Sequence, residues 1–278
     1  MMNTHLILKH FPNHILFRLL HYSLIAAQLR DEVGSEVASI KPRYAQEWQP
    51  FSLWLINMLL AYAGDIIANI MLGTLPLEPL CSGHDVLFCT LTWYVIFYCP
   101  FNLGYALART ATFRILATTI TAISQVLLID KGVNMAGRVY DNAVVPMIVI
   151  GTVMGSGAEL LKPVASILIN KCQHNNAAYV KLTTNSKLAL CISGLYALQV
   201  NRSNLLLGLT HHQLQIYLLI ILMTFKYMSL AYRMDHMIWL IEARLRYALF
   251  GGFYSDLSKF FKRPPLDRRS RRSFSKFD

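Results

Sequence analysis

Two apolar segments of the sequence share a pattern in which small residues are followed directly by an acid. One reads Ala63-Gly64-Asp65-Ile66-Ile67, and the other reads Gly155-Ser156-Gly157-Ala158-Glu159. An ionisable side chain inside an apolar segment is costly in lipid, so it indicates an ion or substrate path. Glycine breaks at matching places in two such segments indicate a path built from an internal repeat. The candidate ion-path residues are Gly64, Asp65, Gly155, Ser156, Gly157 and Glu159.

Each segment taken alone also fits an alternative, in which the glycines pack helices together and the carboxylate reaches water. The occurrence of the pattern twice favours the path. Glu159 lies three residues before Lys162, so the two side chains share a helix face and are expected to pair. Asp65 has no such partner in its own segment. It must therefore face the interior of the bundle, water or a base on another helix.

The composition indicates which elements hold these residues. The chain has 278 residues, of which 55% are hydrophobic and 15% are charged, whereas soluble domains are about 25% charged. This length can hold about six to eight membrane spans. The sequence shows no nucleophile elbow, phosphate-binding loop or metal-ligand spacing, and its five cysteines form no CxxC pair. We therefore predict an all-α polytopic membrane protein and expect neither an enzyme nor a metal site.

Seven apolar segments are expected to span the membrane. They are residues 15–28, 50–75, 86–99, 112–129, 143–169, 188–200 and 214–231. The acids lie in the second and the fifth, so the first three spans and the next three form two triplets, about residues 15–103 and 112–200. A triplet has an odd number of spans, so the second begins from the opposite side of the membrane and forms an inverted repeat. The fold is thus predicted as two inverted three-helix repeats plus a seventh helix.

Basic residues set the expected orientation. The loops on one side of the spans carry eight Lys and Arg residues, those on the other side carry four, and the tail after Asp256 adds eight to the first side. Because basic residues remain cytoplasmic, residues 1–14 are expected outside the cytoplasm. Residues 233–278, an amphipathic helix and a basic tail, are expected inside it, beside anionic lipid rather than nucleic acid. The sequon at Asn201 lies on the non-cytoplasmic side.

Several runs of residues follow the pattern of one known family. Trp93-Tyr94-Val95-Ile96-Phe97-Tyr98-Cys99-Pro100 ends the third span, where Pro100 is expected to stop or kink the helix. Residues 151–157 carry the Gly-Ser-Gly run in the fifth span, and Lys226 lies in the seventh. With residues 50–73 and 186–199, these runs resemble the trimeric intracellular cation channels, the TRIC family. The resemblance covers about residues 50–226.

The resemblance implies a homotrimer in which residues 15–232 form a seven-helix channel domain with its own pore. It implies a potassium-permeable channel of the endoplasmic or sarcoplasmic reticulum that balances charge during calcium release. Lys226 and Lys187 are then expected to be internal counter-charges or gate elements. The resemblance also implies a phosphoinositide lipid, held by a lysine and an arginine one turn apart on the fourth span.

This sequence departs from the family at the lipid-binding positions. The lysine position is Thr121, the arginine position is Gln125, and the basic position before the Gly-Ser-Gly run is Met154. Neutral groups form weaker hydrogen bonds to phosphate than charged groups do. We therefore expect weak or absent phosphoinositide binding and no other cofactor.

Two further functions remain compatible with the sequence. A secondary transporter uses the same inverted repeats around a saturable substrate site. A non-conducting membrane scaffold of the same fold would account for the neutral side chains at Thr121 and Gln125. Single-channel current steps would separate a channel from both alternatives.

Overall fold

Helices make up the regular structure of the part of the chain that the structure describes. The structure is a computed structural model, and it describes residues 15–37, 50–168, 183–201 and 208–232, together with residues 240, 243, 244 and 247. The α-helices are α2 (Ile15–Val37), α3 (Pro50–Leu72), α4 (Gly83–Tyr98), α5 (Leu103–Ala108), α6 (Ala111–Val139), α7 (Val144–Leu168), α8 (Thr184–Asn201) and α9 (His211–Tyr232). Two short 3₁₀ helices, Glu78–Cys81 and Pro100–Asn102, flank α4.

Each of the seven predicted spans corresponds to one long helix, but the ends of two were wrong. The fourth span was predicted to end at residue 129, whereas α6 continues to Val139. The apolar run stops at residue 129 because Asp130 and Lys131 follow. The helix continues because Asp130 pairs with His211 and Lys131 pairs with Asp65, both on other helices. The first span was predicted to end at residue 28, whereas α2 continues to Val37.

Among the described residues, four helices are long and apolar enough to cross a bilayer. They are α3, α6, α7 over Val144–Lys162, and α9 over His211–Ala231. Helix α4 joined to the segment Pro100–Ala108 makes a fifth if the bent pair counts as one span. Helix α2 carries Arg18 and Arg30 within its length, and it does not reach the same apolar threshold. The fold is therefore a polytopic helical membrane protein with at least four apolar spans.

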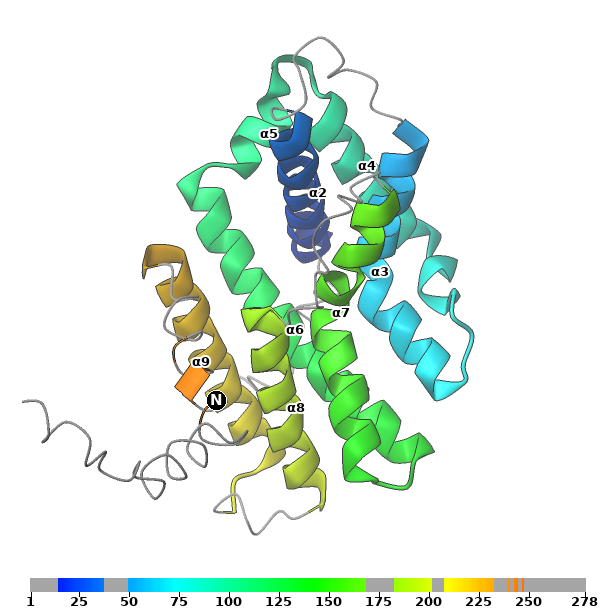
Figure 1. The fold of residues 1–278 in the computed structure, drawn as a ribbon, viewed down its shortest axis with the longest axis vertical. Helices are drawn as coiled ribbons and strands as arrows, with labels where there is room; N and C mark the ends of the chain where they lie inside the picture. Colours follow the sequence, from blue (N-terminus) through cyan, green and yellow to red (C-terminus); the bar gives the residue numbers. More distant parts are fainter. Residues whose placement is uncertain are drawn as a thin grey trace, which may run out of the picture. The chain divides into compact units, whose positions relative to one another are not determined.

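Among the described helices, α7 is the centre of the packing. It packs against α3, α6 and α8, and Figure 1 shows it between α3 and α8. The main buried cluster joins Val126 and Ile129 of α6, Met147 and Ile150 of α7, and Tyr196 of α8. A second cluster joins α2, α3 and α4. The elements that carry the two acid-containing segments, α3 and α7, are thus held directly against each other.

The expected kink at Pro100 is confirmed. The helices on either side of it are bent by 97°, and Phe101 and Asn102 both adopt a positive φ of 56°. The bend leaves carbonyls at the end of α4 without helical partners. Arg30 of α2 donates to one of them, the carbonyl of Ile96, and also to Oδ1 of Asn102 at 2.7 Å. Helix α2 therefore braces the bend.

The chain divides into two compact units, Met1–Met228 and Ser229–Asp278. The predicted outer segment 1–14, most of the predicted amphipathic helix and the basic tail lie outside the described residues. So do Arg202 and Ser203 of the sequon. Asn201 is described, and its Nδ2 donates to the carbonyl oxygen of Asn142 at 3.0 Å.

Candidate functional site

Helices α3 and α7 touch through their glycines. A Cβ atom added at Gly64 would lie 2.7 Å from the carbonyl oxygen of Met154, and one added at Gly157 would overlap the backbone of Gly64. Real side chains do not tolerate such contacts with backbone, so only glycine allows this approach. Helix α3 runs through Gly64 without interruption, and the predicted break there is wrong because that glycine serves close packing.

The predicted break in α7 is confirmed at one residue. Ser156 has φ −135° and ψ 16°, outside the helical range. Its hydroxyl donates to the carbonyl oxygen of Thr152 at 2.7 Å, which occupies an acceptor of the preceding turn. The irregular turn lies directly before Glu159 and opposite Gly64. It sets the direction in which the acid leaves the helix.

A cavity of about 150 Å³ opens beside this crossing. Its walls come from α2, α3, α6, α7, α8 and α9. Every residue that the sequence indicated for an ion path or for lipid lines it: Gly64, Asp65, Thr121, Gln125, Gly155, Ser156, Gly157, Glu159 and Lys226. Lys187, the other lysine considered, is not among the residues that line it. The residues predicted for the ion path and those at the lipid-binding positions therefore line the same cavity.

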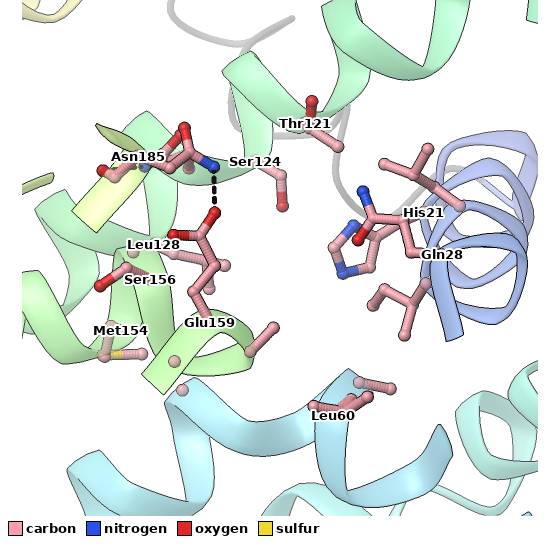
Figure 2. Close-up of a pocket in the computed structure, with 18 of the residues that line it drawn as sticks. His21, Gln28, Leu60, Thr121, Ser124, Leu128, Met154, Ser156, Glu159 and Asn185 are labelled. Atoms are coloured by element: carbon pink, nitrogen blue, oxygen red, sulfur yellow. Dashed lines mark hydrogen bonds between the residues drawn. The ribbon is translucent and has the colours of Figure 1, made fainter. Parts of the chain in front are cut away.

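Glu159 is held by uncharged donors from α8. Asn185 donates through Nδ2 to Oε1 at 2.8 Å (Figure 2). Ser186 donates through Oγ to Oε2 at 3.1 Å. The predicted pair between Glu159 and Lys162 is wrong. Lys162 instead lies 3.2 Å from Oε1 of Glu32 on α2, because that helix supplies a separate acid. Glu159 thus keeps a negative charge that its hydrogen-bond partners do not neutralise.

Asp65 has a base on another helix, which was one of the three expected environments. Nζ of Lys131 on α6 lies 2.8 Å from Oδ1 of Asp65. The Lys131 side chain is 54% exposed and that of Asp65 is 26% exposed, so the pair lies near the edge of the packed region. The two acids therefore differ, since Asp65 forms an ion pair, whereas the hydrogen-bond donors that hold Glu159 are neutral.

The sequence interpretation missed the wall of the cavity that α2 provides. His21 and Gln28 face Ser124 and Glu159 across the open space, with Leu60 below (Figure 2). The predicted ion path included neither His21 nor Gln28. The seven-residue spacing between His21 and Gln28 places both on one helix face. These two polar residues on one face of the helix were the feature of the sequence that could have indicated a cavity wall on α2.

Helix α6 supplies the opposite polar stripe. Thr121, Ser124 and Gln125 line the cavity from neighbouring turns. The Thr121 hydroxyl donates to the carbonyl oxygen of Thr118 at 2.9 Å. Gln125 is only 4% exposed, and its Nε2 lies 3.4 Å from the carbonyl oxygen of Asn185. Among the described residues, no group of three His, Cys, Asp or Glu side chains could hold a metal ion.

Comparison with known proteins identifies similar chains along most of this length. The family model described as TRIC channel matches residues 41–233. The trimeric intracellular cation channel type B of Danio rerio is 27% identical over 251 residues, which cover 90% of this chain and 84% of the relative.

Solved structures share the fold. A trimeric intracellular cation channel from C. elegans without Ca²⁺ is 24% identical, with a TM-score of 0.67 over 78% of this chain and 90% of that one. A structure described as the structural basis for activity of TRIC counter-ion channels in calcium release is 22% identical. It has a TM-score of 0.67 over 81% of this chain and 98% of that one.

Proposed function

This chain belongs to the TRIC channel family, and from that membership we propose that it is a potassium-permeable channel of an intracellular membrane. Members of the family are ion channels and not enzymes. The observation that carries the proposal is the single cavity lined by both acids, by the irregular turn at Ser156 and by Lys226. Acidic side chains and free backbone carbonyls are the groups that select cations in a path.

The remaining features of the proposed channel come from the family and from the charge pattern. The family name indicates a trimeric assembly, and we propose one ion path in each protomer. We propose seven spans, arranged as two inverted triplets plus a last helix, and the long helices α2, α3, α4, α6, α7, α8 and α9 of the described residues support this arrangement. The basic loops and tail favour a lumenal N-terminus and a cytoplasmic C-terminus. A solved relative is described as a counter-ion channel in calcium release, and we propose the same role here, in the endoplasmic or sarcoplasmic reticulum.

Recordings from purified protein in planar bilayers test the proposal. We expect discrete potassium currents under symmetric potassium chloride, because two carboxylates, those of Asp65 and Glu159, line the cavity. A folded trimer that passes no current at any voltage, with or without calcium, would point to the scaffold alternative. Saturable uptake into liposomes without current steps would point to a transporter.

Neutralising Glu159 should change ion selectivity more than neutralising Asp65. Glu159→Gln removes a charge that only neutral donors hold, whereas Asp65→Asn frees Lys131, which is half exposed and can turn to water. We expect the reversal potential in a potassium chloride gradient to move toward zero for Glu159→Gln and less for Asp65→Asn. Asp85→Asn is the matched control, because Asp85 pairs with Arg18 away from the cavity. Equal shifts for all three variants would contradict a path beside Glu159.

A further inference from the structure

We propose that Gln125, Asn185 and Glu159 form a binding site for one monovalent cation inside the cavity, and that the ammonium group of Lys226 competes with the ion for that site. The inference rests on the proposed channel function and names where an ion would stop along the path. It concerns Gln125, the position at which the family pattern has an arginine and this chain has an amide.

The orientation of the Gln125 amide group is determined by its neighbour. Its Nε2 lies 3.4 Å from the carbonyl oxygen of Asn185, which can only accept a hydrogen bond, so the nitrogen must face it. Oε1 then points the other way. This oxygen is buried and has no hydrogen-bond partner among the described residues, although Gln125 lines the cavity. A buried acceptor without a partner is costly, so the position calls for an electropositive occupant.

Asn185 also fixes the second oxygen group. Its side chain donates to Glu159, while its carbonyl accepts from Gln125. One residue of α8 therefore ties an amide oxygen of α6 and a carboxylate of α7 to the same side of the cavity. A carboxylate offers about four acceptor positions, and the donors of Asn185 and Ser186 use two of them. The remaining positions are available to an ion.

The Ser124 hydroxyl of α6 adds to the oxygen-rich wall. The Thr121 hydroxyl of the same helix points away from the open space and donates to the carbonyl of Thr118. Ser124 lines the cavity, and Figure 2 shows its side chain projecting into that space. Oxygen ligands of this kind replace the hydration shell of a potassium ion.

The charges around the cavity favour a single positive charge. Asp65 is paired with Lys131, and Lys162 is paired with Glu32. Glu159 and Lys226 remain, one of each sign. Glu159 and Lys226 attract each other electrostatically, so an ion can bind the carboxylate only by displacing the ammonium group, and a single carboxylate suits a monovalent ion better than a divalent one. The Lys226 ammonium has no hydrogen bond or ion pair with any residue that the structure describes, and it carries the same charge as the ion. It therefore competes for the same oxygens.

Binding of ⁸⁶Rb⁺ to the purified full-length protein tests the site without requiring conduction. We expect Gln125→Met to weaken binding about tenfold or more, because it keeps the shape and removes the oxygen. Lys226→Met should strengthen binding, because it removes the competitor. Gln199→Met is the control, since Gln199 is also buried but bonds to Leu209 and His211 and does not line the cavity.

The outcomes separate this inference from the channel proposal. The absence of Rb⁺ binding to the parent protein at 100 mM, on the order of a cellular potassium concentration, overturns the inference. So does unchanged binding by either cavity variant. If Gln125→Met fails to fold, the result for Lys226→Met decides alone. Rb⁺ binding that responds as expected in a protein that passes no current supports the site and contradicts the channel. Potassium currents with binding unaffected by both variants contradict only the site.

Discussion

Replacing Gly157 with leucine is expected to prevent α3 from packing against α7 and to leave little folded protein. A Cβ atom at this position would overlap the backbone of Gly64, which cannot move aside as a flexible side chain can. Inserting side-chain atoms into a packed region costs ~1–3 kcal/mol, and contact with backbone places this variant at the upper end or beyond. The fraction of monodisperse protein in size-exclusion chromatography and its thermal midpoint measure the effect.

Gly194→Leu in α8 is the matched control for this variant. A Cβ atom added at Gly194 meets no atom within 4 Å, so the same change of residue type should be tolerated there. Gly64→Leu should behave like Gly157→Leu, because both glycines form one contact. A Gly157→Leu protein that elutes and melts like Gly194→Leu would show that the two helices do not touch in the way described.

The double variant Thr121→Lys, Gln125→Arg should gain phosphoinositide binding. The two residues lie one turn apart on α6 and both line the cavity. The introduced lysine and arginine could therefore bind the same lipid headgroup. Two charge-assisted hydrogen bonds in place of two neutral ones favour the lipid by ~2–4 kcal/mol. This corresponds to roughly a 30- to 1,000-fold gain in affinity. Native mass spectrometry or liposome competition measures it.

Thr112→Lys with Leu116→Arg is the matched control for the lipid experiment. These residues have the same spacing on α6, but they are exposed and do not line the cavity. Added charge alone should raise non-specific membrane binding equally in both variants. Tight and specific binding by the unaltered protein would contradict the expectation. It would indicate that Arg109, Arg114 or the backbone at Ser156 and Gly157 holds the headgroup.

The position of the site could be predicted from the sequence because it depends on local patterns. Acids within apolar segments are rare enough to indicate Asp65 and Glu159, and a gap-free match to a family locates Thr121 and Gln125. The partners could not be predicted, since they come from other helices. Asp65 meets Lys131 across 66 residues, and Glu159 meets Asn185 across 26. Spacing along one helix suggested Lys162 instead, which was wrong.

Helix ends were misjudged for a related reason. Apolar runs mark the part of a helix that lipid or core surrounds, and α6 extends beyond that part because Asp130 and Lys131 find partners. The role of Gly64 was also open in the sequence. A glycine beside an acid fits both a broken helix and a close crossing, and only the neighbouring helix distinguishes them. Here the crossing partner is Gly157.

The spacing of two residues along α6 gives the separation of the two acids along the helix axis. Gln125 is joined to Glu159 through Asn185, and Lys131 is joined to Asp65. Six residues separate these two attachment points, which is about 9 Å along a helix axis. The carboxylates therefore occupy two levels of depth rather than one shared ring. In the proposed orientation a cytosolic ion would meet Glu159 first and Asp65 second. The ion would then move between two successive binding positions, and the distance between them would be set by the rigid helix α6.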